Sequence, residues 1–236
     1  MAHPLTRTRA GVILGWVTAD RLGACRDAYL AALLGRDAAA ARGAVEDALA
    51  AGAAVEHVYL DVLQPALYGI GHRWAMGEVN VAEEHFATAI THRIIDELST
   101  RRTLPPRDGR LAIVTGTPGE LHALGARIVA DFLEADGWEV LQLGASTPAP
   151  DLAQLVDLER PELVALSTTT AGSLPGVAEV LERLATVRPR PLVVVGGQMW
   201  TEKTRRAANE LGADLVARDP RALVATLRAR VPPPRD

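Results

Sequence analysis

The stretch Leu111-Ala-Ile-Val-Thr115-Gly-Thr-Pro-Gly-Glu120-Leu-His122-Ala-Leu-Gly125 decides the fold class of this chain. A short apolar run is followed by a loop containing glycine and proline, and then by a segment with helical periodicity. The same strand-to-helix order recurs down to residue 230. The predicted strands are 111–115, 138–143, 163–167, 191–195 and 214–217, and the predicted helices are 123–135, 151–158, 174–186, 201–211 and 220–230. Five such units in a row predict a doubly wound, five-stranded parallel sheet.

The first half of the chain has a different pattern. Apolar residues recur at i, i+3, i+4 and i+7, which predicts helices at 21–34, 38–51, 55–72 and 81–98. Asp37 is placed to cap the second helix. Four helices with short connections predict a small antiparallel four-helix bundle.

Five segments follow from these patterns. Residues 1–20 form a short N-terminal extension, 21–102 the four-helix bundle and 103–110 a linker, in which Pro105 and Pro106 prevent helix continuation. Residues 111–230 form the α/β domain, and residues 231–236 form a proline-rich tail.

Composition excludes several classes of protein. Cys25 is the one cysteine, so neither an intrachain disulfide nor a cysteine-based zinc site is expected. The net charge of −4 provides no overall attraction to nucleic acid. The apolar run at residues 11–17 is too short to span a bilayer, so no membrane association and a cytoplasmic location are expected.

The loop after the first predicted strand contains the pattern E-x-H-x-x-G. It has neither the G-x-G-x-x-G of a dinucleotide site nor the Gly-Lys-Ser/Thr of a P-loop. The imidazole of His122 is a suitable transition-metal ligand, and Glu120 can accept its other ring N–H. Gly125 lets the following helix begin close to a ligand. The alternative is a surface histidine that happens to have an acidic neighbour.

Two other strand ends should lie beside this loop, because ligands bind beyond the carboxyl ends of parallel strands. The third strand ends in Ser167-Thr-Thr169-Thr170, and the fourth ends in Gly196-Gly197. These small residues predict a narrow slot.

Together these motifs resemble those of the cobalamin-binding domains of methionine synthase and its relatives, with D-x-H-x-x-G, S-x-L or S-x-T, and G-G on a flavodoxin-like (Rossmann-like) framework. The resemblance implies that His122 ligates cobalt in place of the cofactor's own base. It also implies that Ser167, Thr169, Gly196 and Gly197 line the slot for the displaced nucleotide tail. Glu120 stands where many members have aspartate, so its contact with His122 is expected to be direct with altered geometry, or through water.

The helical half contains W-x9-E-H, formed by Trp74, Glu84 and His85. This spacing resembles that of the cobalamin-dependent photoreceptors, light-sensitive repressors of the MerR type. The resemblance implies that Trp74 packs over a 5′-deoxyadenosyl group, which the Glu-His pair contacts. The alternative is that Trp74 belongs to the core while Glu84 and His85 are solvated. Ala75 replaces a histidine that follows the tryptophan in several photoreceptors, which leaves the upper ligand after photolysis open.

Three functions remain open, none of them enzymatic in this chain. The favoured one is an adenosylcobalamin photoreceptor that signals through its domain arrangement, its assembly or a protein partner, with transcription as the regulated process in the family. About twenty residues precede the helices, too few for a winged helix-turn-helix, so direct DNA binding is not expected. The alternatives are a corrinoid methyl carrier using methylcobalamin, and a sensor or carrier of cobalamin.

Overall fold

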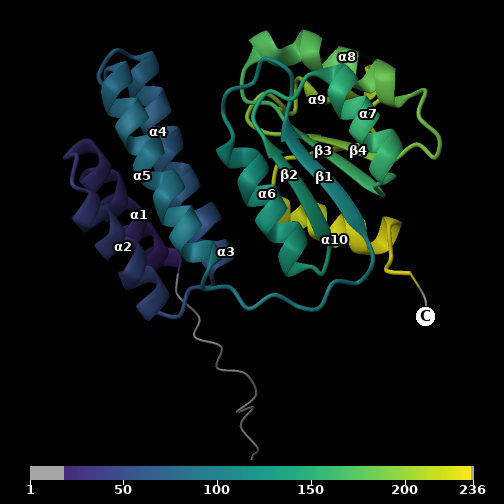
Figure 1. Cartoon of the computed structure of the whole chain (residues 1–236). Helices are drawn as coiled ribbons and strands as arrows, with labels where there is room; N and C mark the ends of the chain where they lie inside the picture. Colours follow the sequence, from purple (N-terminus) through teal and green to yellow (C-terminus); the bar gives the residue numbers. More distant parts are fainter. Residues whose placement is uncertain (1–18, 235–236) are drawn as a thin grey trace, which may run out of the picture. The chain divides into compact units, whose positions relative to one another are not determined.

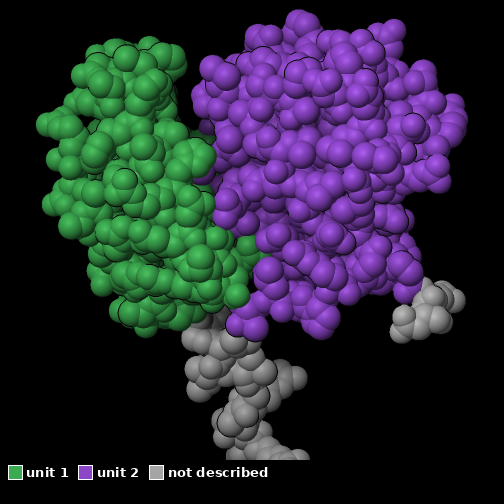
Figure 2. Space-filling view, in the orientation of Figure 1, with its two compact units in different colours: residues 1–102 green, residues 103–236 purple. Residues whose placement is uncertain are grey.

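The computed structural model describes residues 19–234, and the chain divides into two compact units between Arg102 and Thr103 (Figure 2). The first unit is helical and the second is an α/β unit built on a five-stranded sheet (Figure 1). The predicted order of a helical region followed by a parallel α/β region is confirmed. No helix in the described range is both long and apolar enough to cross a membrane.

The helical unit contains four helical segments. Its elements are α1 (Ala19–Leu34), α2 (Ala38–Ala50), α3 (Val55–His57), the π-helix η1 (Val58–Leu63), α4 (Gln64–Ala75) and α5 (Val81–Ser99). The third helical segment runs through α3, η1 and α4. The Asp37 side chain accepts from the backbone N–H groups of Ala39 and Ala40 at 3.0 and 2.9 Å, which confirms the predicted cap. Asn80 and Glu83 form a capping box that starts α5.

The third helical segment differs from the prediction of one regular helix over residues 55–72. It begins as α3, passes through the six-residue π-helix η1 and continues as α4 to Ala75. Pro65 has no N–H with which to continue the ordinary hydrogen-bond ladder. The N–H of Gln64 instead donates to the carbonyl of Tyr59, five residues back. The wider turn thus accommodates the proline without ending the helical segment.

The α/β unit contains five parallel strands in the order β2-β1-β3-β4-β5. The strands are β1 (Leu111–Gly116), β2 (Glu139–Gly144), β3 (Leu163–Ser167), β4 (Leu192–Gly196) and β5 (Leu215–Ala217). The helices are α6 (Leu124–Ala135), α7 (Ala149–Glu159), η2 (Ala171–Ser173, a 3-10 turn), α8 (Leu174–Leu184), α9 (Arg205–Glu210) and α10 (Pro220–Arg230). This strand order is the flavodoxin-like doubly wound topology, as predicted.

The two faces of the sheet have different cores. Large aliphatic residues such as Val164, Leu166 and Val195 pack with Trp200 and with residues of α7 and α8. The intervening positions on β1 and β3 include Ala112 and Ala165, which are smaller. Figure 1 shows α6 and α10 on the opposite side of the sheet from α7 and α8. The α6 and α10 face of the central strands therefore combines these alanines with the larger Val114 and Leu163.

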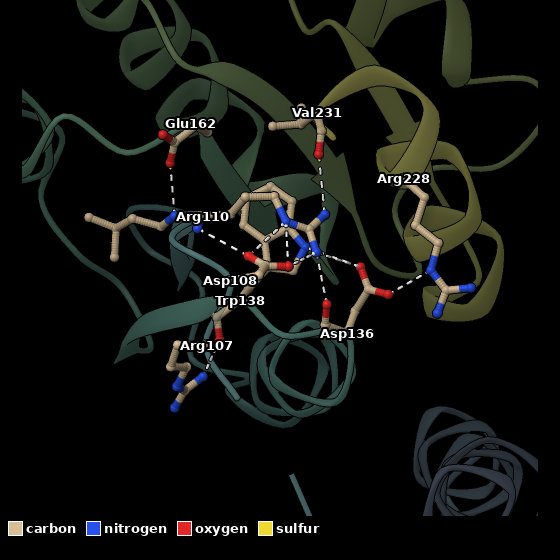
Figure 3. A network of polar contacts seen from close by, with 9 residues as sticks. Arg107, Asp108, Arg110, Asp136, Trp138, Glu162, Arg228 and Val231 are labelled. Carbon is tan, nitrogen blue, oxygen red and sulfur yellow. Dashed lines mark hydrogen bonds and ion pairs between the residues drawn. The ribbon is translucent and has the colours of Figure 1, made fainter. Parts of the chain in front are cut away.

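A polar network lies at the amino-terminal ends of β1 and β2 (Figure 3). The Arg110 side chain is 3% exposed and pairs with Asp108 and Asp136, and its guanidinium lies 4.4 Å from the centre of the Trp138 ring. It also donates to the carbonyl of Val231 at 3.2 Å. The network therefore joins the end of the interunit segment, the α6–β2 turn and the end of α10.

Candidate functional site

The site lies at the carboxyl ends of β1 and β3, where the topology reverses. The chain leaves β1 for α6 and leaves β3 for α8, on opposite faces of the sheet (Figure 1). Such a switch point is where open α/β sheets bind ligands. The loops remain tied near the strand ends, because the N–H of Thr117 donates to the carbonyl of Ser167 at 3.1 Å.

Glu120 is the buried centre of this site, with 1% of the residue exposed. Its Oε1 accepts from the backbone N–H of His122 at 3.0 Å and also contacts Nδ1 of the His122 ring. Its Oε2 accepts from the backbone N–H groups of Thr169 at 2.6 Å and Thr170 at 3.1 Å, with the Ser173 hydroxyl at 3.4 Å. One carboxylate thus joins the loop after β1 to the loop after β3.

These contacts determine the charge of Glu120. Burial by itself would raise the pKa of this carboxyl group, because it penalises the charged form. The hydrogen bonds from His122, Thr169 and Thr170 outweigh burial and hold the pKa below its usual value. Glu120 is therefore a carboxylate at neutral pH, so the Nδ1 of His122 is the protonated ring nitrogen and donates to it.

His122 is held on one side and open on the other. Its side chain is 56% exposed, and no described residue makes a hydrogen bond or ion pair with Nε2. A neutral imidazole protonated at Nδ1 carries its lone pair on Nε2, which is the form that binds a metal. The described residues contain no group of three or more His, Cys, Asp or Glu side chains able to hold an ion. His122 therefore offers a single nitrogen donor to a metal.

The loop that carries His122 has a second support, which the sequence did not reveal. The N–H of Gly119 donates to the Ser146 hydroxyl at 3.0 Å, and the Thr115 and Thr147 hydroxyls lie 2.7 Å apart. Ser146 adopts a φ of 51°, a left-handed conformation that is unusual for a residue other than glycine. The loop after β2 therefore holds the His122 loop in place.

The predicted glycines are all sites of close approach within the unit. A Cβ at Gly125 would lie 2.7 Å from the Ser167 hydroxyl, and one at Gly196 would lie 2.8 Å from the Ala217 carbonyl. Gly197 has a φ of +106°, and a Cβ there would lie 2.3 Å from the Thr168 carbonyl. Packing within the unit thus accounts for each glycine, and their lining of a tail slot stays a prediction.

The predicted serine and threonine positions have separate roles in this geometry. Ser167 is 7% exposed and lies against Gly125, so the loop after β1 and the end of β3 are in contact. Thr169 contributes its backbone N–H to Glu120, while Ser173 adds a side-chain donor that the sequence did not suggest. The α/β unit therefore brings Glu120, His122, Gly125, Ser167 and Thr169 to one edge of the sheet.

The other three predicted residues lie together at one end of a helix pair in the helical unit. Trp74 is in the last turn of α4 and is 53% exposed, so it is not a core residue of this unit. Glu84 is in the first turn of α5 and His85 directly follows it, and residues 76–80 connect α5 to α4. The Glu84 carboxylate accepts from His85 Nδ1 at 2.6 Å and from the Thr88 hydroxyl at 2.8 Å. This end of the unit therefore presents an exposed indole and a polar pair.

Comparison with known proteins assigns a class to both units. Residues 110–227 match a family described as a B12 binding domain, and residues 25–99 match a second family with the same description. The chain therefore belongs to the cobalamin-binding domain families, in a form that combines a helical unit with an α/β unit.

Individual relatives fall into two groups. The chain is 33% identical over 174 residues to the HTH-type transcriptional repressor CarH of Myxococcus xanthus, covering 73% of this chain and 57% of that protein. It is 28% identical over 167 residues to a trimethylamine corrinoid protein of Methanosarcina barkeri, covering 68% of this chain and 75% of that protein. The chain spans little more than half the length of the repressor.

A solved structure shares the fold. The monomethylamine corrinoid protein of Methanosarcina barkeri superimposes with a TM-score of 0.75 at 20% identity, covering 89% of this chain and 99% of that one. This likeness is one of fold. The relatives thus include a transcriptional repressor as well as corrinoid proteins.

Proposed function

We propose that this protein is an adenosylcobalamin photoreceptor that binds its cofactor base-off, with Nε2 of His122 as the lower cobalt ligand. Light would be read out as a change in domain arrangement, assembly or partner binding. The cofactor supplies a light-sensitive cobalt–carbon bond, and the protein supplies ligation, packing and readout. Cobalamin binding is a property of the family, whereas the light response is our inference.

The contact between Glu120 and His122 supports the proposed role of His122 as the lower cobalt ligand. A buried carboxylate with several backbone donors cannot rotate freely, so it fixes both the tautomer and the direction of the imidazole. In the proposal, His122 displaces the nucleotide tail of the cofactor. The slot for this tail is lined by Ser167, Thr169, Gly196 and Gly197. Gly125 allows α6 to start close to that tail.

The proposed binding of the adenosyl group rests on the exposed Trp74. An indole with more than half its surface exposed has area left for a flat partner such as an adenine ring. The Glu84 carboxylate, oriented by His85 and Thr88, is an acceptor for ribose hydroxyls or an adenine amine. Trp74, Glu84 and His85 therefore favour the adenosyl form of the cofactor over the methyl form.

A methyl carrier is the second candidate, and one observation favours it. Curated relatives include corrinoid proteins named for trimethylamine and dimethylamine. A carrier would use the same His122 and would hold methylcobalamin for a methyltransferase partner. It has no evident need for an exposed tryptophan followed by a glutamate-histidine pair.

An absorption experiment separates the two candidates. The protein is loaded with adenosylcobalamin or methylcobalamin in the dark, and its spectrum and elution volume are recorded before and after green light. The photoreceptor proposal predicts a His-ligated adenosyl spectrum that converts on illumination, together with a change in assembly or shape. Photolysis with no such change, and equal affinity for both forms, would favour the carrier.

Two variants assign the residues. His122→Ala should remove the His-ligated spectrum and weaken binding of both forms. Trp74→Ala should keep that spectrum but lose preference for the adenosyl form, whereas Leu34→Ala, which alters another exposed apolar residue of the helical unit, should behave as the parent. If Trp74→Ala discriminates the two forms as the parent does, the assignment of Trp74 is wrong.

A further inference from the structure

We infer that Leu121 is a contact residue for the lower face of the corrin ring. The inference rests on the proposed role of His122 as the cobalt ligand. It adds an apolar contribution from the protein to the side of the macrocycle that the histidine approaches. Neither the motif E-x-H-x-x-G nor the glycine and serine positions assign any role to this leucine.

The Leu121 side chain is open to solvent. Leu121 is 80% exposed, the highest value among the exposed large hydrophobic side chains in the described part of the chain. A single exposed leucine is ordinary on a protein surface and needs no partner. Leu121 differs through its position in the sequence, because its two neighbours are the buried Glu120 and His122, whose imidazole is open on one side.

Leu121 is the residue directly before His122 in the chain. Neighbouring Cα atoms are about 3.8 Å apart, which is short compared with the reach of a macrocycle around its central metal. In the proposed complex, a ring bound through Nε2 of His122 would reach the residues next to it in the loop. The Glu120 side chain turns inward to the loop after β3, so it offers no surface to the ring. Leu121 is the neighbour whose side chain is left exposed there.

An apolar side chain suits the surface of a corrin ring. The edge of a corrin carries methyl groups and methylene carbons, and burying apolar surface against them removes it from water. Truncating Leu121 to alanine removes three carbons, and the ring would cover only one side of them, so binding should weaken by roughly tenfold, which corresponds to about 1.4 kcal/mol. The loss should be the same for every corrinoid, whatever its upper group or nucleotide tail.

The test compares three variants with the parent protein by spectrophotometric titration. Leu121→Ala removes the contact, and Leu121→Met keeps most of its apolar volume. Leu158→Ala is the matched control, since Leu158 on α7 is 75% exposed. The ligands are adenosylcobalamin and adenosylcobinamide, which has the same ring but no nucleotide tail.

The expected result is a roughly tenfold loss for Leu121→Ala with both ligands, at an unchanged thermal midpoint of the ligand-free protein. Leu121→Met and Leu158→Ala should stay within about twofold of the parent. At saturation, Leu121→Ala should still show the His-ligated spectrum.

Three results would overturn the inference. They are Leu121→Ala binding both ligands within twofold of the parent, a loss confined to adenosylcobalamin, and a saturated variant without His ligation, which would mean that Leu121 only supports the loop. The proposed function fails separately, in the parent protein, if no corrinoid binds or if His122→Ala leaves its spectrum unchanged.

Discussion

Oε1 of Glu120 accepts hydrogen bonds from both the backbone N–H and the ring Nδ1–H of His122. The other oxygen, Oε2, accepts from the backbone N–H groups of Thr169 and Thr170. Both oxygens of the carboxylate are therefore acceptors, and each serves a different loop. An aspartate at this position has a side chain one methylene shorter, so it could not make all of these contacts in the same backbone geometry.

Glu120→Gln should weaken cobalamin binding by roughly 10- to 100-fold, the usual effect of losing the partner of a metal-bound histidine. An amide has a single oxygen, so in either orientation its NH2 group faces backbone or ring donors. Spectrophotometric titration with hydroxocobalamin measures the loss. Glu179→Gln is the control, because Glu179 lies in an exposed pair with Arg183. A loss smaller than threefold for Glu120→Gln would show that the carboxylate does not orient His122.

Gly197→Ala should destabilise the α/β unit by about 3 kcal/mol, because it combines a positive φ with a clash against a backbone carbonyl. Gly212→Ala is the matched control, with a φ of +98° and nothing within 4 Å of the added Cβ. It should cost only about 1–2 kcal/mol. Denaturant unfolding measures both variants. A stable Gly197→Ala that binds cobinamide but not cobalamin would instead assign Gly197 to the nucleotide tail.

The fold was predictable because it depends on local periodicity. Alternation of apolar runs with helical segments defined the sheet, and the predicted strand at residues 163–167 is the observed β3. The π-helix η1 was missed, because a helix that contains one π-helical turn shows much the same spacing of apolar residues as a regular α-helix. Pro65 was the available signal, because a proline in a long helical pattern requires a local adjustment.

The site was predictable to the extent that it lies in one loop. Glu120 and His122 are two residues apart, so their pairing could be inferred from the sequence. Ser146 and Ser173 reach the same loop from other connections, 27 residues from Gly119 and 53 from Glu120. Contacts at such separations depend on register and on loop conformation, which residue patterns do not report.

Stability of the helical unit should fall at high pH because of Tyr29. This residue is fully buried, and burial raises its pKa to about 12 despite a hydrogen bond with Thr91. The folded state keeps the proton between pH 10 and 12 while the unfolded state releases it. The contribution is therefore complete below pH 10 and is lost as pH rises toward 12, by about 2–3 kcal/mol in total.

Tyr29→Phe checks this expectation. The variant should lose roughly 1 kcal/mol at pH 7, together with its hydrogen bond, but should show less loss than the parent between pH 10 and 12. Denaturant unfolding followed by far-ultraviolet circular dichroism measures both. Tyr68→Phe, at a residue that is 46% exposed, should keep the parent's pH dependence. Identical pH profiles for the parent and Tyr29→Phe would contradict the assignment.

Arg110→Met should destabilise the α/β unit by about 3 kcal/mol at pH 7, since it removes the buried guanidinium that pairs with both Asp108 and Asp136. Arg228→Met removes the other, exposed partner of Asp136 and should cost about 1 kcal/mol or less. Similar losses for the two variants would show that the network in Figure 3 contributes no more than a surface ion pair.

Acid should act through the same network. A hydrogen bond from the Arg110 side chain is the main cause that holds the pKa of Asp108 below its usual value of 3.8, against the opposing effect of burial. The folded state therefore binds a proton there less readily than the unfolded state does. The stabilisation is complete above that value and is lost as pH falls below it. The unfolding free energy of the parent should fall below about pH 4, and Arg110→Met should fall less steeply because Asp108 has lost the donor that lowers its pKa.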